Sequence, residues 1–240
     1  MPDEPDSPIA HRAFDRLAAG YDRDGHRKPS NAYLERPATR SLLPAVAGCR
    51  ILDAGCGAGH LAAALGDRGG AVVGLDVSAT MAGYARDRAP NAEIVQAALE
   101  RDLPFADDVF EGVVGSLSFH YVEAWEPLFR ELRRVLVPGG WVVYSVQHPH
   151  ADFEEYEDVD NYHEVERVSA TWDSFGVTVD VPTYRRPLAE LVTPAIEAGF
   201  RLERLLEPTP TAAFRKVNPA RYEYEATHPN FLCCRFSLLE

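Results

Sequence analysis

The stretch Arg50-Ile51-Leu52-Asp53-Ala54-Gly55-Cys56-Gly57-Ala58-Gly59-His60-Leu61 decides the fold of this chain. Its apolar start is typical of a short buried strand, and its three glycines predict a tight turn that opens a helix. Glycine at the end of a strand lets backbone N–H and C=O groups approach a ligand that a side chain would push away. His60 stands where a dinucleotide-binding fingerprint has its third glycine, so the match to that motif is incomplete.

The composition is that of an ordinary globular protein. The chain has 240 residues, of which 46% are hydrophobic, enough for one α/β domain with an insertion or for two small domains. Its net charge of −13 works against binding nucleic acid or an anionic membrane, because both require clustered cations. No apolar run approaches the ~20 residues that a membrane span needs.

Cysteine spacing and the N-terminus indicate the cellular context. The four cysteines stand at positions 49, 56, 233 and 234, and they are not spaced as zinc ligands, so no metal site is expected. A reduced, cytoplasmic protein is the expectation for such cysteines. Residues 1–8 are acidic and proline-rich, unlike a secretory signal, and they predict a disordered tail.

From residue 50 the chain alternates predicted strands and helices with short loops, which indicates parallel strands joined by right-handed crossovers. Strands are expected at 50–54, 71–76, 92–96, 110–116, 141–146 and 200–207, and helices at 59–67, 78–88, 125–137 and 187–198. The last strand, 231–239, follows without a crossover helix, so an antiparallel final pair is expected. The prediction is a doubly wound, Rossmann-like seven-stranded sheet with its ligand at the carboxyl ends of the strands.

A single domain of residues 9–240 is expected. Its parts are N-terminal cap helices (9–48, with helices at 9–20 and 31–43), a ligand-binding core (49–146), an inserted cap (147–186) and the C-terminal part of the sheet (187–240). The inserted cap is acidic and aromatic, and it contains a predicted hairpin near 164–180. It follows the carboxyl end of a strand and is therefore expected to cover the substrate, the alternative being an ordinary surface insertion.

Asp76 closes the second predicted strand, where a carboxylate can accept two hydrogen bonds from a ribose diol. A helix N-cap is its alternative role, but Ser78 competes for that position. Two cofactor classes are compatible with such a site, a nicotinamide or flavin dinucleotide and S-adenosylmethionine. A dinucleotide needs a free helix N-terminus for its pyrophosphate and a third glycine for close helix packing. A methionine-tailed nucleoside needs backbone acceptors and a carboxylate near its ammonium. Asp53 and the carbonyls around Gly55 supply the second set.

Several motifs occur together in a fixed order over about residues 50–146. They are Ile51-Leu52-Asp53-Ala54-Gly55-Cys56-Gly57-Ala58-Gly59, Val73-Gly74-Leu75-Asp76-Val77-Ser78 with Met81, Leu103-Pro104-Phe105-Ala106-Asp107-Asp108-Val109-Phe110, and Leu132-Arg133-Arg134-Val135-Leu136-Val137-Pro138-Gly139-Gly140. In these motifs the chain resembles the class I S-adenosylmethionine-dependent methyltransferases, in particular the group with the methyltransferase type 11 domain. Ala19-Gly20-Tyr21-Asp22, Arg186-Pro187-Leu188 and Ala198-Gly199-Phe200 match that group more loosely.

The resemblance implies S-adenosylmethionine as the cofactor and S-adenosylhomocysteine as its product. The residues that it places around the cofactor are Asp53, Gly55, Cys56, Gly57 and Ser116 at the methionine moiety, Asp76 at the ribose, Val77, Met81, Ala98 and Leu99 at the adenine, and Tyr21 closing over it. Many relatives have an aspartate where Ala98 stands here. Glu100 or a backbone carbonyl is the candidate to serve the adenine amino group instead.

Methyl transfer requires little acid–base chemistry, because a sulfonium methyl is already activated and its leaving thioether is neutral. Alignment of the nucleophile, methyl carbon and sulfur does most of the work. A base is needed only for a hydroxyl or a protonated amine acceptor. The candidate catalytic residues are His120 and His148, with His150, Tyr156 and Tyr162 as further candidates; for each histidine a structural or pocket-wall role is the alternative.

The sequence therefore predicts methyl transfer to a small-molecule acceptor, and the aromatic cap favours an apolar or planar one. A cofactor-binding module without catalysis and an RNA or protein methyltransferase are the alternatives, and the acidic charge disfavours RNA. No nucleic-acid or membrane partner is expected, and the chain is expected to be a monomer or a homodimer.

Overall fold

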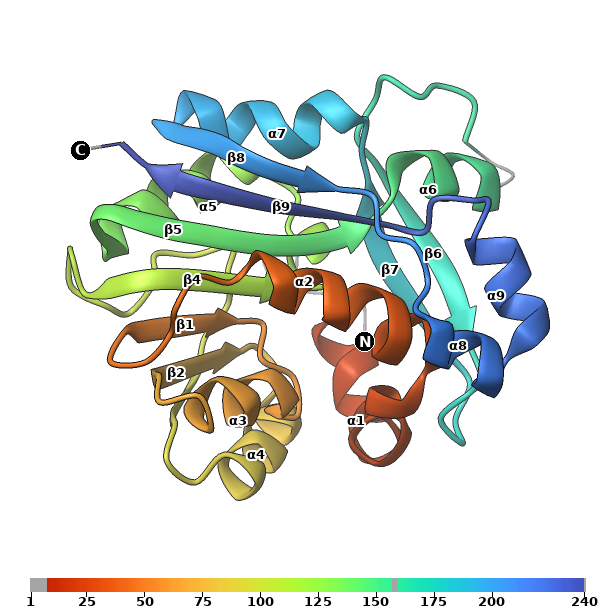
Figure 1. The fold of residues 1–240 in the computed structure, drawn as a ribbon, viewed down its shortest axis with the longest axis horizontal. Coiled ribbons are helices and arrows are strands. Elements are labelled where there is room, and N and C mark those ends of the chain that lie inside the picture. Colours follow the sequence, from red (N-terminus) through yellow and green to blue (C-terminus); the bar gives the residue numbers. More distant parts are fainter. Residues whose placement is uncertain (1–7, 157–158, 240) are drawn as a thin grey trace.

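The computed structural model describes residues 8–156 and 159–239, so the predicted tail lies outside the described residues except for Pro8. Its centre is a seven-stranded sheet in the order β3-β2-β1-β4-β5-β9-β8 (Figure 1). The strands are β1 (Arg50–Ala54), β2 (Ala71–Asp76), β3 (Glu93–Gln96), β4 (Phe110–Ser116), β5 (Leu136–Gln147), β8 (Phe200–Leu206) and β9 (Phe231–Leu238). β1 to β5 pair in parallel, whereas β9 runs antiparallel to both β5 and β8. The predicted doubly wound sheet with an antiparallel last strand is confirmed.

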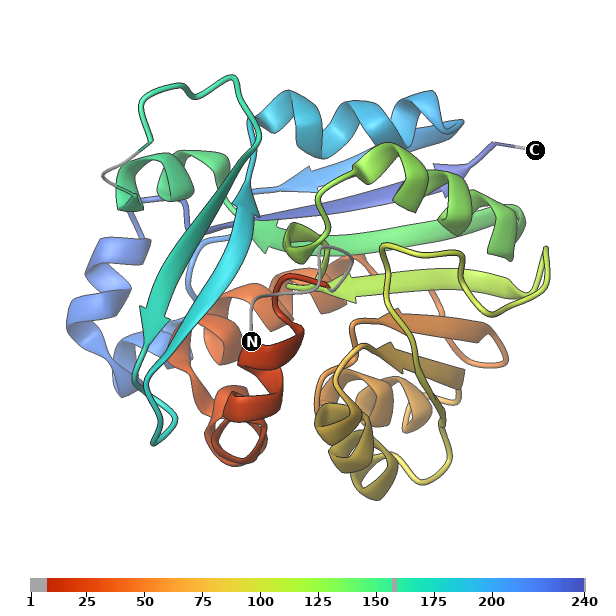
Figure 2. The ribbon, with the colours of Figure 1, turned by 180° about the vertical axis from the view of Figure 1, so that it is seen from behind.

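Helices cover both faces of the sheet, which is why its central strands are nearly continuous apolar runs. One face packs against α2 (Arg36–Leu42), α3 (His60–Gly66) and the end of α4 (Ala79–Arg88). The other face packs against α5 (Trp125–Val135) and α7 (Leu188–Glu197), as Figure 2 shows from behind. The carboxyl ends of the parallel strands stay clear of both helix layers.

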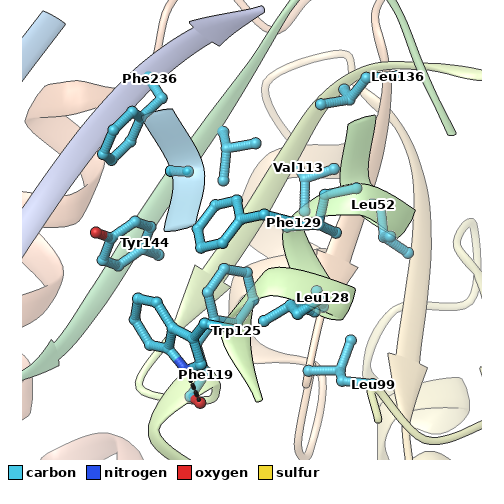
Figure 3. Close-up of a cluster of buried hydrophobic side chains, with 14 of the residues drawn as sticks. Leu52, Leu99, Val113, Phe119, Trp125, Leu128, Phe129, Leu136, Tyr144 and Phe236 are labelled. Atoms are coloured by element: carbon cyan, nitrogen blue, oxygen red, sulfur yellow. Dashed lines mark hydrogen bonds between the residues drawn. The ribbon is translucent and has the colours of Figure 1, made fainter. Parts of the chain in front are cut away.

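The α5 face of the sheet contains an aromatic core (Figure 3). Tyr144 stacks on Phe236 with ring centroids 5.8 Å apart, and Phe129 lies edge-on to Tyr144 at 6.1 Å. Trp125 donates its indole N–H to the carbonyl of Phe119 at 3.1 Å, which gives a buried polar group the partner it needs. This packing fixes the short 3-10 turn η3 (Phe119–Tyr121) beside the end of β4.

The helix expected over 125–137 ends earlier, at Val135, and the strand expected over 141–146 begins earlier, at Leu136. Leu136 pairs with Phe110 of β4, so this residue already belongs to the sheet. The segment Pro138-Gly139-Gly140 lies inside β5 and does not end a helix. A long-range strand pairing therefore moves a boundary that the local sequence places two residues later.

The inserted cap consists of α6 (Pro149–Glu155) and a separate hairpin of β6 (Glu166–Trp172) and β7 (Val179–Arg185). The predicted hairpin is present, but β7 continues to Arg185. β7 packs against α1 (His11–Asp24), and the two lie side by side in both ribbon views (Figures 1 and 2). Their shared contacts include Ala13, Leu17, Phe175, Val179 and Val181.

Three short helices were not predicted: α6, α8 (Ala212–Val217) and α9 (Pro219–Glu225). The helix expected over 31–43 is present, but its first five residues form a π-helical turn, η2 (Asn31–Glu35), that leads directly into α2. The 3-10 turn η1 (Gly25–Arg27) connects α1 to this region. Within residues 8–156 and 159–239, no helix is long and apolar enough to cross a membrane.

The aromatic core is expected to supply a large share of the stability. Phe129→Ala removes a fully buried ring and is expected to lower the free energy of unfolding by about 3–5 kcal/mol, because the vacated volume cannot collapse completely. Urea denaturation measures this change. Ile196→Ala, at a half-exposed position on α7, is the control and should change stability by less than about 0.5 kcal/mol; equal effects of the two variants would contradict the packing argument.

Candidate active site

The glycine turn after β1 is built around positive φ angles. Gly55 has φ +82° and Gly57 has φ +52°, a region that residues with a Cβ rarely adopt. The N–H groups of Gly55 and Cys56 both donate to the carbonyl of Leu75, at 2.8 and 2.9 Å. A Cβ on Gly55 would collide with Ser118, whereas one on Gly57 would meet no atom within 4 Å. The turn is therefore tied to β2 on one side and open on the other.

A cavity lies on the open side of this turn, at the carboxyl ends of the parallel strands. Ten of the sequence-predicted cofactor residues line it: Tyr21, Asp53, Gly55, Cys56, Gly57, Asp76, Val77, Met81, Leu99 and Ser116. Ala98 does not line the cavity, although its neighbours Ala97, Leu99 and Glu100 do. The structure thus brings together residues from α1, the glycine turn, β2, α4 and β4.

The Asp76 carboxylate is held by the backbone. Its Oδ2 accepts from the Gly57 N–H at 2.8 Å and its Oδ1 accepts from the Ser78 N–H at 2.9 Å. Ser78 itself caps α4, because its hydroxyl accepts from the Met81 N–H at 3.1 Å. Each carboxylate oxygen of Asp76 keeps a second lone pair for a ligand hydroxyl. Burial raises the pKa of Asp76 to about 6.

Asp53 is the second buried carboxylate of the cavity, with 1% of its surface exposed. Its Oδ2 has no hydrogen-bond partner among the described residues. Burial, and then the charge of Asp76, raise its pKa to about 7. An unpartnered buried carboxylate costs free energy unless a cation or a hydrogen-bond donor meets it. This end of the cavity is therefore suited to a positively charged group.

Aromatic rings form the wall opposite the glycine turn. The ring of Phe14 lies 5.2 Å from Tyr121 and 6.0 Å from Tyr21, measured between centroids. Tyr21 also contacts Phe175 of the hairpin loop at 5.4 Å. The Lys28 ammonium lies 4.4 Å from the Trp172 ring centroid, within the range of a cation–π interaction. Phe14 and Tyr21 of α1 therefore line the cavity, and the hairpin packs behind them.

Three basic side chains of the cavity were missed by the sequence-based prediction: His11, Arg36 and His60. The His60 ring lies 4.7 Å from that of His26, and burial, then the charge of Arg88, lower the pKa of His60 to about 4. His60 is therefore neutral at pH 7. Its position directly after the glycine turn was a usable signal. Arg36 precedes the sheet in an unrelated stretch of sequence and gave none.

The candidate bases do not line this cavity. His120 is buried against Tyr121, with ring centroids 4.2 Å apart, and burial, then Arg186, lower its pKa to about 3. His148 caps α6, since its Nδ1 accepts from the His150 N–H at 3.2 Å, and its Nε2 lies 2.8 Å from Glu207 Oε1. His148 thus makes the contacts of a structural histidine, whereas the Nδ1 of His120 is buried without a hydrogen-bond partner among the described residues. The strand end fixes the position of the backbone but not the direction of the side chain.

The other candidates also make contacts outside the cavity. His150 pairs with Glu154 at 3.4 Å. The hydroxyl of Tyr162 accepts from the Leu188 N–H at 3.1 Å. Tyr156, at the end of α6, has a pKa raised by burial and then by the charges of Asp152 and Glu155. Among the described residues, no group of three or more His, Cys, Asp or Glu side chains is placed to hold a metal ion.

Comparison with known proteins identifies the class of protein that has this architecture. The model of the Methyltransf_11 family, described as a methyltransferase domain, matches residues 52–144. A crystal structure of an S-adenosylmethionine-dependent methyltransferase from Mesorhizobium loti superposes with a TM-score of 0.69 at 29% identity, covering 85% of this chain and 97% of that one. The fold and the glycine turn are thus those of class I methyltransferases.

Curated relatives agree with this class. A malonyl-[acyl-carrier protein] O-methyltransferase of Pectobacterium atrosepticum is 32% identical, covering 56% of this chain and 51% of that protein. A demethylmenaquinone methyltransferase of Clavibacter sepedonicus is 38% identical, covering 54% of each. The chain spans about half the length of these two relatives. It belongs to the class I S-adenosylmethionine-dependent methyltransferases, and S-adenosylmethionine is its cofactor.

The raised pKa of Asp53 makes stability depend on pH. In the folded chain Asp53 keeps its proton up to about pH 7, whereas in the unfolded chain it loses it near pH 4. Between these values the folded state binds more protons, so the free energy of unfolding falls as pH rises. Asp53→Asn should remove this contribution, which we expect to be about 2–3 kcal/mol between pH 5 and pH 8.

Urea denaturation of the wild type and Asp53→Asn at pH 5, 6, 7 and 8 measures this difference. Asp87→Asn, on the exposed face of α4, is the matched control and should follow the wild type at every pH. Parallel curves for the wild type and Asp53→Asn would show that Asp53 ionises in the folded chain as freely as in the unfolded one.

Proposed function

We propose that this enzyme transfers the methyl group of S-adenosylmethionine to a small-molecule acceptor held between the glycine turn and the inserted cap. The observation that carries the proposal is the continuity of the cavity from the buried carboxylates to the aromatic wall of Phe14, Tyr21 and Tyr121. The hairpin packs behind the α1 part of that wall, and an enclosed site of this kind suits a small acceptor better than a polymer. The acidic charge of −13 also disfavours nucleic acid as a partner.

The cavity residues fit the cofactor in the order of the strands. Apolar Val77, Met81 and Leu99 suit the adenine near β3, and the free lone pairs of Asp76 suit the ribose diol at the end of β2. The unpartnered Oδ2 of Asp53 suits the ammonium of the methionine tail at the end of β1. When bound, S-adenosylmethionine supplies a methyl carbon already activated by the sulfonium charge.

Arg36 completes this set at the methionine end. Its guanidinium lines the same cavity as Asp53, and it is anchored by donating to the carbonyl of His26 at 2.6 Å. A guanidinium is the natural partner of the methionine carboxylate. The residues of the chain therefore bind and orient the reactants and exclude water, and alignment provides most of the rate enhancement.

The names of the relatives support a small or carrier-bound acceptor. One relative is named for malonyl-[acyl-carrier protein] and the other for demethylmenaquinone. These acceptors differ in polarity, so they define a range and not a single substrate. The aromatic wall of this chain favours an acceptor in the apolar or planar part of that range.

Equilibrium binding and methyl transfer test the proposal together. Isothermal titration should show saturable binding of S-adenosylmethionine and no binding of NAD. Incubation with methyl-labelled S-adenosylmethionine and a panel of small phenols, quinols, amines, acids and acyl-carrier-protein thioesters should then label at least one of them. Labelling of bulk RNA or protein in place of every small acceptor would overturn the assignment of acceptor class.

The ribose assignment makes a separate prediction. Asp76→Ala removes a carboxylate that is expected to accept two hydroxyl hydrogen bonds, and affinity for S-adenosylmethionine should fall by about 1–3 kcal/mol. Calorimetric titration measures this change in affinity. Asp87→Ala, on the exposed face of the following helix α4, is the control. Unchanged affinity in Asp76→Ala, with the fold intact by circular dichroism, would remove Asp76 from the site.

A further inference from the structure

Glu35 is a buried carboxylate that none of the assigned roles uses. It is not itself among the residues that line the cavity, but it accepts a hydrogen bond from Ser116, which does line it. Only 1% of its surface is exposed. Its Oε1 accepts three hydroxyl hydrogen bonds, from Thr39 at 2.7 Å, Ser116 at 2.9 Å and Ser145 at 2.6 Å. All three bonds fall on the same oxygen, which leaves Oε2 available.

The backbone that carries Glu35 is irregular. Glu35 ends the π-helical turn η2 (Asn31–Glu35), immediately before α2. Helix α2 packs over β5 and β9 and crosses the sheet beside β4 and β5 in Figure 1. Single π-helical turns are rare and recur at functional sites. Here the turn brings an acidic side chain onto the carboxyl ends of β4 and β5.

The strand order locates Glu35 relative to the cofactor. In the proposed pose the adenine lies near β3, the ribose at the end of β2 and the methionine tail at the end of β1. The next strand across the sheet is β4, followed by β5, each about 4.8 Å further on. Ser116 ends β4 and lines the cavity, and Ser145 lies on β5. Glu35, bonded to both, therefore lies beyond the sulfur, on the side away from the adenosine.

The effect of Glu35 on the pKa of Tyr21 agrees with this position. The pKa of Tyr21 is raised mainly by burial; Arg36 opposes the shift, and the charges of Glu35 and Asp76 add to it. Tyr21 lines the cavity. The Glu35 carboxylate is thus close enough to act on a group that sits between Tyr21 and the end of β4.

The charge of Glu35 is not explained by its hydrogen bonds. A neutral amide oxygen at this position could accept from the same three hydroxyls. Burying a carboxylate costs several kcal/mol unless a cation or further donors compensate, and no lysine, arginine or histidine of the described residues forms an ion pair with it. A hydrogen-bond donor or a cation that enters the cavity beside Ser116 would add to the compensation that the three hydroxyls supply.

We propose that Glu35 is the residue that receives the methyl acceptor, and that the acceptor presents an N–H or O–H group to its Oε2. This inference rests on the proposed function. In the transfer, a lone pair of the acceptor nitrogen or oxygen forms the new bond to the methyl carbon. The bond from carbon to sulfur breaks with its electron pair remaining on sulfur as a neutral thioether, and the proton of the acceptor passes to Glu35 Oε2.

This assignment defines a class of acceptor. An amine or a hydroxyl compound donates to Glu35 and gains from its charge. A carboxylic acid that is ionised at pH 7 would bring a second negative charge against Glu35 and would be excluded. The acceptor class is therefore neutral or cationic, with the nucleophilic atom carrying a hydrogen.

Sinefungin tests the position of Glu35 without knowledge of the acceptor. This analogue of S-adenosylmethionine carries an ammonium group where the transferable methyl would be, whereas S-adenosylhomocysteine carries nothing there. Glu35→Gln should weaken sinefungin binding by about 10-fold or more, as expected for the loss of a charge-assisted hydrogen bond, and should change S-adenosylhomocysteine affinity by less than about 2-fold. Calorimetry at pH 7.5 measures both affinities.

Two control variants separate charge from structure. Thr39→Val removes one of the three supporting hydroxyl bonds and keeps the charge. Glu225→Gln neutralises another buried carboxylate, which is 2% exposed and bonded to Ser30 and Asn230 but does not line the cavity. Neither should change the ratio of the two affinities by more than about 3-fold. An equal loss of both ligands in Glu35→Gln would show a structural role and overturn the proposal.

A measurement on the wild type keeps the proposal testable if Glu35→Gln does not fold. The wild type should bind sinefungin at least as tightly as S-adenosylhomocysteine, and a clear preference for S-adenosylhomocysteine would overturn the role of Glu35 alone. A wild type that binds neither ligand would instead overturn the proposed function.

Discussion

The carboxylate of Asp76 joins the two segments on which the rest of the structure depends, the glycine turn and the end of β2. It accepts from Gly57 on one side and from Ser78 on the other, while Leu75 holds the start of the turn from the same strand. Glycine at positive φ would otherwise carry a large conformational entropy. The same bonds aim the open face of the turn at the cavity.

The cost is a pair of buried carboxylates, Asp53 and Asp76, whose raised pKa values show that the folded chain disfavours their charge. Such a concentration of unfavourable charge is typical of a ligand site, because the ligand relieves it.

How far the sequence could predict this structure depends on the range of the interactions involved. β1, β2 and β4 begin and end where the sequence predicts, because each has a short apolar centre bounded by glycine or polar residues. The boundary between α5 and β5 was wrong, since the pairing of Leu136 with Phe110 is not visible locally. α9 has a local signal that the sequence-based prediction did not use, an Asn218 cap followed by Pro219. The hairpin was predicted, but its second strand was expected to end near residue 180, whereas β7 continues to Arg185. Pro182 and the polar residues of β7 are tolerated because the ribbon has only two strands.

How much of the candidate site could be predicted depends in the same way on the range of the interactions. The segment from Asp53 to Met81 encodes its part of the cavity locally, since a strand, a turn and a helix follow one another within it. Arg36 and Glu35 come from a helical segment that precedes the sheet and reaches the cavity only through the tertiary fold. His148 shows the converse: its backbone lies after a strand end as expected, but its ring bonds to His150 and Glu207. Position relative to a sheet is thus predictable from a sequence, whereas side-chain direction depends on packing that the sequence does not display.

The charges of the cavity bear on both binding and release. If the donor binds as proposed and Glu35 has its proposed role, the acidic groups Asp53, Asp76 and Glu35 act on a donor whose ammonium and sulfonium are both positive, and Arg36 pairs with the single carboxylate of that donor. Methyl transfer removes the sulfonium charge and places a proton on Glu35, so one cation and one anion disappear from the cavity together. A pair of unit charges at about 4 Å interacts by roughly 4 kcal/mol at an effective dielectric constant near 20, and this attraction is present before the reaction and absent after it. The acidic cavity therefore favours the donor over its neutral thioether product, and product release is aided by the same carboxylates that make the donor bind.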